Sequence, residues 1–221
     1  HILSGHSALS VVNPKNRGVI GFSSVVFEEI DIYINCMKSL KEFSAEKGLL
    51  KPLYVFVPRA PEAFDDIFKK IEKAGLSVVR RSESFSDDLQ PNTLFDWNNI
   101  DVFLGDSFGE MYFYLNLCDH VVASGGFSYK GAHNIIEQLQ LHKPITVGPE
   151  IWTIKFPALQ AEEAGLLKVV KDPAELKSNL SLFLENITAS KISKDKFEGF
   201  LKVYAGASKK ALAMLESKGL I

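Results

Sequence analysis

Apolar residues gather in short runs that alternate with stretches of helical periodicity. Seven short runs with apolar centres predict strands, and the run at 53–57 is apolar at every position, as a strand buried on both faces of a parallel sheet is. They cover residues 17–24, 53–57, 76–79, 101–104, 120–123, 144–147 and 167–170. Apolar residues at helical spacing predict helices between them, over about 27–47, 61–74, 111–117, 157–164 and 194–217, with others that open near 132 and 173. Strands alternating with helices predict an α/β fold, a Rossmann-like parallel sheet with helices on both faces.

Local signals predict where several elements begin and end. Gly48 is a plausible C-cap for the first long helix, because glycine adopts positive φ without cost. Asp172 followed by Pro173 and Glu175 is a typical helix start. The stretch 83–99 is polar and lacks a clear period, so a loop is expected there.

The stretch 122–148 reads VASGGFSYKGAHNIIEQLQLHKPITVG and predicts a strand, a glycine-rich loop, a helix from about Ala132 and a second strand. Glycines allow a backbone to approach a ligand closely, and a helix N-terminus attracts phosphate. His133, Asn134 and Glu137 would share one polar face of that helix. The alternative is a tight turn followed by a helix cap, with no ligand.

Polar or glycine-rich clusters follow four of the predicted strands. They are Ser23–Ser24, Pro58–Arg59, Gly105–Glu110 and Ser124–Asn134. Ligands of parallel α/β sheets bind outside the carboxyl ends of the strands. The agreement of four strand ends therefore predicts a ligand site at this edge.

Single residues in these clusters have more than one reading each. Arg59 can fork onto phosphate or carboxylate oxygens, or it is a surface arginine paired with Glu62 or Asp65. Glu110 accepts from ligand hydroxyls or base donors, or it interacts with a helix dipole. His133 is a phosphate contact, an acid–base group or a capped helix residue.

Composition narrows the function classes. The 221 residues are 46% hydrophobic and carry a formal net charge of −2, so nucleic acid is not expected as a partner. Two cysteines with no implied pairing suit a reducing compartment. The sequence contains no run of about 18 apolar residues, so no membrane span is predicted. The sequence has no pair of His or Cys residues at metal-ligand spacing. It also has no Gly-x-Ser-x-Gly motif and no Gly-x-Gly-x-x-Gly motif.

The chain begins with His1 and has no signal peptide, so we expect a piece of a longer protein. Residues 1–16 are expected to be a linker and residues 17–190 the ligand-binding α/β domain. Residues 191–221 are expected to form a helical segment that packs on this domain or toward a preceding one.

Several motifs resemble, in order, those of one known family. GDSFGEM, residues 105–111, is similar to the family's Gly-Asp-Thr-x-Gly-Glu. SGGFSYKGAHNIIEQ, residues 124–138, is similar to Gly-Gly-Ser followed by Gly-Gly-His-Asn-x-x-Glu-Pro. KPITVGP, VPRAPEAF and VVRRS, at 143–149, 57–64 and 78–82, match three further motifs. The family is that of the 3-deoxy-D-manno-octulosonic acid (Kdo) transferases of lipopolysaccharide synthesis, and the similarity runs over about 17–171.

The resemblance implies the C-terminal, donor-binding half of a GT-B glycosyltransferase that moves Kdo from CMP-Kdo to lipid A or its precursor. It implies no cofactor and no metal. The catalytic base, the acceptor site and the membrane anchor belong to an N-terminal domain, at the cytoplasmic face of the bacterial inner membrane. The residues that fall where the family holds CMP, or line the same loop, are Pro58, Arg59, Phe108, Gly109, Glu110, Gly131, His133, Asn134, Ile135, Ile136 and Glu137.

The sequence departs from the family pattern at several positions. Val25 stands in place of a histidine, and Ala60 and Ala63 replace a histidine and an arginine. Ala132 replaces a glycine and Gln138 a proline. Two alternatives to CMP-Kdo transfer are therefore kept: a related UDP-sugar transferase, and a non-catalytic binding module on the same fold.

The C-terminal segment carries an apolar stripe of Phe197, Phe200, Leu201 and Tyr204 among lysines. One reading is an amphipathic helix that closes its own domain. The resemblance to GT-B enzymes implies docking on the N-terminal domain, with the lysines toward an anionic membrane surface. Docking predicts that part of the stripe is exposed.

Overall fold

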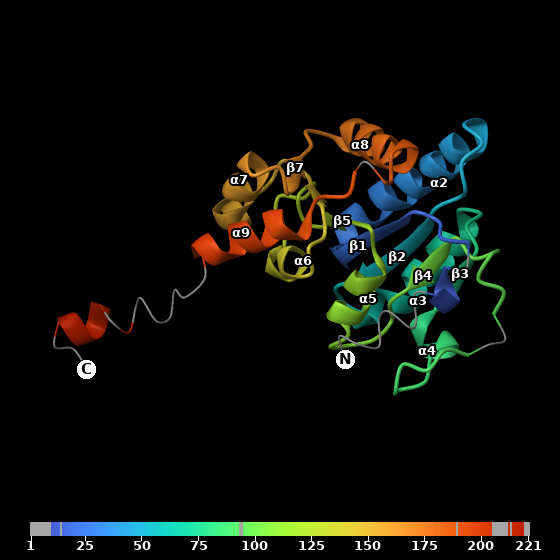
Figure 1. Cartoon of the computed structure of the whole chain (residues 1–221). Coiled ribbons are helices and arrows are strands. Elements are labelled where there is room, and N and C mark those ends of the chain that lie inside the picture. The colour runs from blue at the N-terminus through green and yellow to red at the C-terminus, as the bar shows by residue number, and fades with distance from the viewer. Residues whose placement is uncertain are drawn as a thin grey trace.

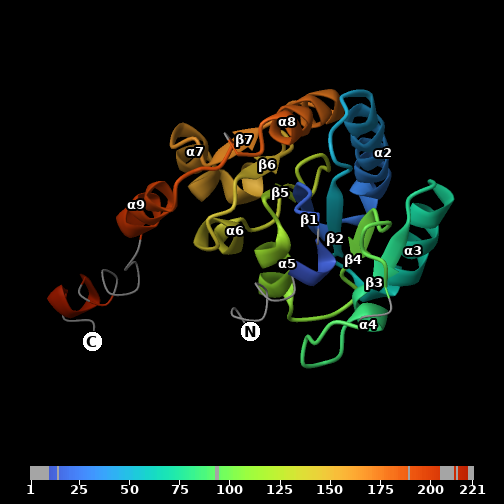
Figure 2. The same cartoon turned by 45° about the vertical axis from the view of Figure 1, so that its right-hand side comes forward.

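The strands form one parallel sheet in the order β3-β4-β2-β1-β5-β6-β7 (Figure 2). A computed structural model describes residues 10–13, 15–92, 95–188, 190–204, 212 and 214–218. The strands are β1 Val19–Val25, β2 Leu53–Pro58, β3 Val78–Arg80, β4 Val102–Leu104, β5 His120–Ala123, β6 Ile145–Val147 and β7 Leu167–Val169. All seven predicted strands are confirmed, and the predicted α/β fold with them.

Helices connect consecutive strands on both faces of the sheet (Figure 1). The α-helices are α2 Ile30–Glu46, α3 Phe64–Lys73, α4 Arg81–Ser84, α5 Met111–Leu117, α6 Ile136–Gln140, α7 Lys155–Glu163, α8 Pro173–Glu185 and α9 Lys194–Tyr204. Short 3-10 helices η1 Phe27–Glu29, η2 Pro61–Ala63 and η3 Trp152–Ile154 precede three of them. As predicted, Gly48 follows α2 with a φ of +65°, and the Asp172 side chain caps α8 by accepting from the Glu175 amide at 2.8 Å.

One face of the sheet packs against α2, α3 and α8. Ile20 and Phe22 from β1 and Tyr54 from β2 are fully buried there, against Met37 of α2 and Ile71 of α3. Alternate residues of the same strands point to the opposite face. The helices α2 and α8 lie side by side on this face in Figures 1 and 2.

The opposite face packs against α5 and the 85–97 loop. Val55 and Phe103 of the sheet meet Phe113 of α5 and Phe85 and Trp97 of the loop. The polar stretch predicted as a loop therefore contributes two buried aromatic rings. Because such rings bury 150–250 Å² each, this loop is held firmly by the core.

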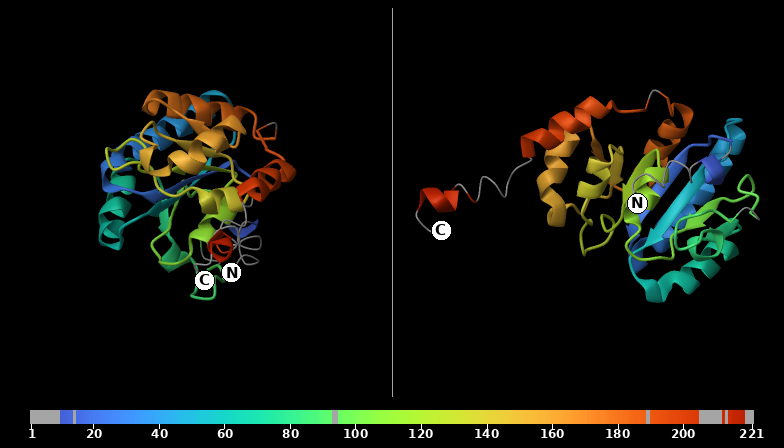
Figure 3. Two further views of the ribbon diagram at one scale, coloured as in Figure 1. Left: turned by 90° about the vertical axis from the view of Figure 1, so that its left-hand side faces the viewer. Right: turned by 60° about the horizontal axis from the view of Figure 1, so that its bottom comes forward.

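The ends of the chain pack on this core to different extents. Val12 is fully buried in the cluster that contains Val19, so the packed part of the chain extends upstream of Arg17. The helix α9 packs on α6 through the fully buried Phe197, and Figure 3 shows it beside α7. Residues 1–9 of the predicted linker, and residues 205–211, 213 and 219–221 of the predicted C-terminal segment, lie outside the described residues.

The apolar stripe of α9 is only partly covered. Phe200 and Leu201 are half-buried against the β5–β7 end of the core, while Tyr204 is 38% exposed. The exposure predicted for this stripe is therefore found at its far end.

The order of the strands places a topological switch between β1 and β5. The chain runs from β1 toward β2 and β4 on one side, and from β5 toward β6 and β7 on the other. The carboxyl ends of β1 and β5 lie next to each other, since Ser23 pairs with Ala123. Ligands bind at such a point in open α/β sheets.

Candidate functional site

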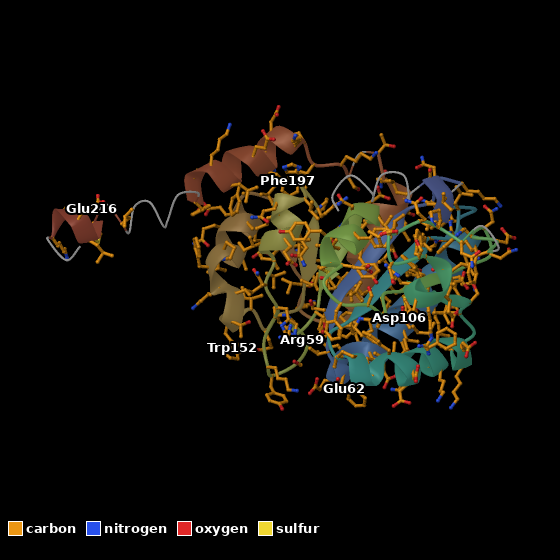
Figure 4. All side chains as sticks on the ribbon, turned by 90° about the horizontal axis from the view of Figure 1, so that it is seen from below. Arg59, Glu62, Asp106, Trp152, Phe197 and Glu216 are labelled. Carbon is orange, nitrogen blue, oxygen red and sulfur yellow. The ribbon has the colours of Figure 1, made fainter. Side chains whose placement is uncertain are left out.

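A cleft of about 390 Å³ opens at the carboxyl edge, beside the ends of β1 and β2. Its apolar wall is formed by Val25, Val26, Ile30 and Ile67, and Ala60 and Ala63 line it as well. Its charged groups are Arg59, Glu62, Glu28 and Lys130. Figure 4 shows Arg59 on the same side of the molecule as Glu62 and Trp152. Three of the departures from the family pattern, Val25, Ala60 and Ala63, thus make this wall apolar.

Arg59 is a free cationic group in this cleft. Its side chain is exposed and makes neither an ion pair nor a hydrogen bond with any residue that the structure describes. Asp65, one of the partners expected for a surface arginine, pairs instead with Arg80 at 2.6 Å. The paired reading of Arg59 is therefore wrong. Its backbone amide is fixed, because it donates to the Val25 carbonyl at 2.9 Å.

The glycine-rich loop after β5 is held by a buried carboxylate that sequence reasoning missed. Glu29 is 0% exposed, and its Oε2 accepts from Ser124 Oγ at 2.7 Å and the Gly125 amide at 2.8 Å. Its Oε1 accepts from the Phe127 amide at 2.6 Å, and the Tyr33 hydroxyl donates to Oε2. A buried carboxylate is tolerated when it is saturated with donors in this way.

The glycines of this loop pack against protein rather than leaving room for a ligand. A Cβ on Gly125 would lie 2.3 Å from the Gly131 carbonyl, and one on Gly126 would lie 2.5 Å from the Gly148 amide. Gly131 has a φ of +82°, and its Cβ would meet Thr153 at 2.7 Å. The expectation that Gly125 and Gly126 serve the approach of a ligand is corrected: they allow loops to approach one another. Gly131 also lines a cleft at this edge.

The helix predicted to open near Ala132 begins at Ile136 instead, and α6 has 5 residues. The Ala132 amide donates to the Glu150 carbonyl at 2.8 Å, and the His133 amide donates to the Ser124 carbonyl at 2.9 Å. Asn134 does cap the helix, because its Oδ1 accepts from the Ile136 amide at 3.0 Å. The predicted phosphate cradle at residues 132–134 is therefore wrong in its geometry, since two of its amides are already bonded.

His133 lies within the electrostatic reach of Arg59. Burial and the Arg59 charge lower the pKa of the His133 ring, and the Glu29 charge raises it. The net effect is a lowered His133 pKa. Its Nε2 is buried and makes no hydrogen bond with any described residue. A buried nitrogen without a partner is rare in folded proteins, so this ring is suited to meet an added group.

Lys130 joins the Arg59 cleft to a second one. Its Nζ pairs with Glu28 at 2.6 Å, and this pairing raises the Lys130 pKa. The second cleft has a volume of about 560 Å³, and its lining includes His133, Asn134 and Ile136 together with Thr153, Ile154, Phe156 and Pro157. Arg59, Lys130 and His133 therefore surround one region at the switch point.

Glu110 lies apart from this region and is already engaged. Its carboxylate pairs with Arg81, with 2.7 Å between Oε2 and the Arg81 Nε, and it also accepts from Ser107. The neighbouring Phe108 is 74% exposed, and Gly109 has a φ of +73° with open space around it. Two roles were predicted for Glu110, a ligand acceptor and a helix-start carboxylate. Neither of them included this salt bridge with Arg81.

The remaining candidates differ in exposure. Pro58 ends β2 and is buried, and Ile135 is 0% exposed. Ile136 is half-buried and lines the second cleft. Glu137 is half-buried and has no ion-pair partner among the described residues. Gln138, a departure from the family pattern, is buried and donates through Nε2 to Ser23 Oγ at 3.1 Å.

Two features are absent from the described residues. No helix there is long and apolar enough to cross a membrane. No three His, Cys, Asp or Glu side chains there gather as a metal site would require.

Comparison with known proteins identifies relatives of the chain. It is 31% identical over 201 residues to a 3-deoxy-D-manno-octulosonic acid transferase of Bordetella pertussis, an alignment that covers 90% of this chain and 44% of the relative. The resemblance to Kdo transferases is confirmed. The Haemophilus influenzae protein of the same name is 32% identical over 120 residues, covering 53% of this chain and 26% of that protein. The chain thus spans less than half the length of these relatives, and no protein-family profile matches it.

Solved structures share the fold. The C-terminal CMP-Kdo binding domain of WaaA from Acinetobacter baumannii has a TM-score of 0.73 and 21% identity, covering 93% of this chain and 100% of that one. Anabaena Alr3699/HepE, solved with UDP-glucose, has a TM-score of 0.58 and 12% identity, covering 97% of this chain and 53% of that one. The fold is therefore that of a C-terminal GT-B glycosyltransferase domain.

Proposed function

We propose that this chain is the donor-binding part of a glycosyltransferase that moves Kdo from CMP-Kdo to lipid A or its precursor in lipopolysaccharide synthesis. The similarity to Kdo transferases along 90% of the chain supports this proposal. So does the fold shared with a domain described as CMP-Kdo binding.

The observation that carries the proposal is the free guanidinium of Arg59, whose charge acts on His133, together with the orphaned Nε2 of His133. Both lie at the switch point, where an anionic ligand would be met by a charge and by a ring nitrogen without a partner. The leaving group of CMP-Kdo is the CMP phosphate. A cation that contacts such a group stabilises the charge that develops on it, so Arg59 takes the role first assigned to the helix N-terminus.

The proposed CMP-binding set keeps the residues that the sequence suggested. Glu137 is assigned to the ribose hydroxyls, since its carboxylate has no ion-pair partner within the described part of the chain. Phe108 and Gly109 contribute an exposed loop after β4, and Glu110 shapes that loop through Arg81. The full set is Pro58, Arg59, Phe108, Gly109, Glu110, Gly131, His133, Asn134, Ile135, Ile136 and Glu137.

The activity belongs to a longer protein in this proposal. The chain spans 44% of the Bordetella relative, and the catalytic base and the lipid A precursor site are assigned to an N-terminal domain. That protein would work at the cytoplasmic face of the inner membrane, with its acceptor at the membrane surface. The 221-residue chain alone is expected to bind CMP but to transfer no sugar.

Isothermal calorimetry with nucleotides tests the proposal. The chain should bind CMP, with UMP and UDP binding at least about tenfold more weakly, a difference of about 1.4 kcal/mol. Tighter binding of UDP would favour a UDP-sugar transferase. A chain that binds none of the three at millimolar concentration would contradict the donor site and favour a non-catalytic module.

A further inference from the structure

Glu29 occupies an unusual place at the switch point. It is the residue before α2, on the β1 side, yet its hydrogen-bond donors all belong to the loop after β5 or to its own helix. It is 0% exposed and makes no ion pair with any described residue. A single buried carboxylate thus connects the two halves of the sheet at the point where their strands diverge.

The contacts of Glu29 fix one face of the loop. Ser124 Oγ and the Gly125 amide share Oε2, and the Phe127 amide binds Oε1. Three successive donors within four residues therefore point toward one carboxylate. Hydrogen bonds to a charged acceptor are stronger than neutral ones, so this loop has little freedom to change shape while Glu29 is ionised.

The fixed loop in turn places His133. The Ser124 carbonyl accepts from the His133 amide at 2.9 Å, so the residue whose hydroxyl binds Glu29 also anchors the backbone of His133. The Gly126 carbonyl accepts from the Glu150 amide, and the Glu150 carbonyl accepts from the Ala132 amide, at 2.9 and 2.8 Å. Both series of hydrogen bonds connect the loop that Glu29 binds to the backbone of Ala132 and His133.

We infer that Glu29 is a positioning residue: it holds the loop after β5 in the shape that places His133 in the cleft adjoining that of Arg59, where Lys130 lines both, for an incoming phosphate. This inference rests on the proposed function, because it concerns the same anion site. Glu29 itself touches no ligand in this arrangement. Its role is to fix the geometry and the local charge of groups that do.

Glutamine at position 29 is the sharpest variant. Glu29→Gln keeps the size of the side chain but replaces one acceptor oxygen by an amide that donates. Whichever way that amide turns, it faces at least one of the loop donors, so the loop must change. The variant also removes a negative charge that raises the His133 pKa.

Asp101→Asn is the matched control. Asp101 is also a buried carboxylate, with a side chain 3% exposed, and it accepts from Ser77, Lys41 and Lys51. It precedes β4 and therefore lies at the amino edge of the sheet, opposite the site. Its neutralisation reports the cost of disturbing a buried carboxylate without disturbing the loop.

The two variants are compared in the 221-residue chain by calorimetry with CMP and by NMR titration of the His133 ring. Glu29→Gln should raise the CMP Kd at least about tenfold and lower the His133 pKa below that of the wild type. Asp101→Asn should change the Kd less than about twofold and leave His133 unchanged. Equal Kd values and equal His133 titrations in Glu29→Gln and wild type would overturn the inference.

Ser124→Ala keeps the test decisive if Glu29→Gln does not fold. It removes one loop donor and keeps the Glu29 charge, so CMP should bind more weakly; wild-type affinity in this variant would then overturn the inference.

If the wild-type chain binds no CMP, the proposed function fails separately. Amide exchange at Gly125 and Phe127 then tests Glu29 directly: faster exchange in Glu29→Gln supports the positioning role, and unchanged exchange refutes it.

Discussion

Replacing Arg59 by glutamine separates binding from stability at the proposed anion site. The Arg59 side chain is exposed and has no ion-pair or hydrogen-bond partner among the described residues. Exposed substitutions of this kind change the free energy of unfolding by less than about 0.5 kcal/mol. Hydrogen bonds to charged groups contribute roughly 1.5–3 kcal/mol, so the CMP Kd should rise by about ten- to a hundredfold.

Arg59→Gln should also change the titration of His133. The Arg59 charge lowers the His133 pKa below its ordinary value of 6.5, so the variant should raise it. Because the folded-state pKa is lowered, the wild type loses stability as pH falls through the pKa of the unfolded chain. That loss should be smaller in Arg59→Gln when urea unfolding at pH 7.5 and pH 5.5 is compared.

Arg80→Gln provides the control for Arg59→Gln. Arg80 pairs with Asp65 at 2.6 Å and lies over the Phe68 ring at 4.5 Å, so its loss should lower stability and leave CMP binding unchanged. The pattern expected for Arg59 is the reverse. If Arg59→Gln binds CMP as the wild type does and leaves His133 unchanged, Arg59 is not part of the anion site.

Three further predictions concern other parts of the chain. Glu137→Ala should weaken CMP binding by roughly 1–3 kcal/mol and leave the unliganded Tm unchanged; a large drop in Tm with normal affinity would make Glu137 structural. Burial lowers the pKa of His120 from 6.5 to about 4, so stability should fall by on the order of 3 kcal/mol as pH drops through that window, and His120→Gln should flatten this profile in urea unfolding. Gly199→Ala, in α9 with open space around it, should add roughly 0.5–1 kcal/mol to the free energy of unfolding; a decrease would contradict a helix at that position.

The strands and most helices were predictable because they depend on local pattern. The run at 53–57 is apolar at each position, and β2 is buried at each position in the structure. Asp172 and Pro173 predicted the start of α8, and the cap hydrogen bond to Glu175 is present. Signals confined to a few neighbouring residues were enough in these cases.

The start of α6 was not predictable from such signals. Glycine followed by a polar stretch resembles a helix entrance, but the amides of Ala132 and His133 donate to Glu150 and Ser124. These acceptors belong to other loops, so the competition is decided by tertiary contacts that the local sequence does not contain. The close packing of Gly126 against Gly148 has the same origin.

The sequence contains a signal for the buried position of Glu29, and the family resemblance obscured it. It occupies the same helical stripe as Tyr33, Met37 and Leu40, all of them buried. A carboxylate on an apolar helix stripe needs hydrogen-bond donors. Its position therefore predicts a contact with another segment even before a structure is known. The donors themselves, some 95 residues away, could only be found in three dimensions.

An NMR titration of the isotope-labelled 221-residue chain with CMP tests the central claim most directly. The account predicts that the amide signals of Gly125, Phe127 and His133 at the carboxyl edge shift with CMP, while those around His120 at the amino edge do not. Shifts confined to the amino edge, or no shifts at millimolar CMP, would contradict it.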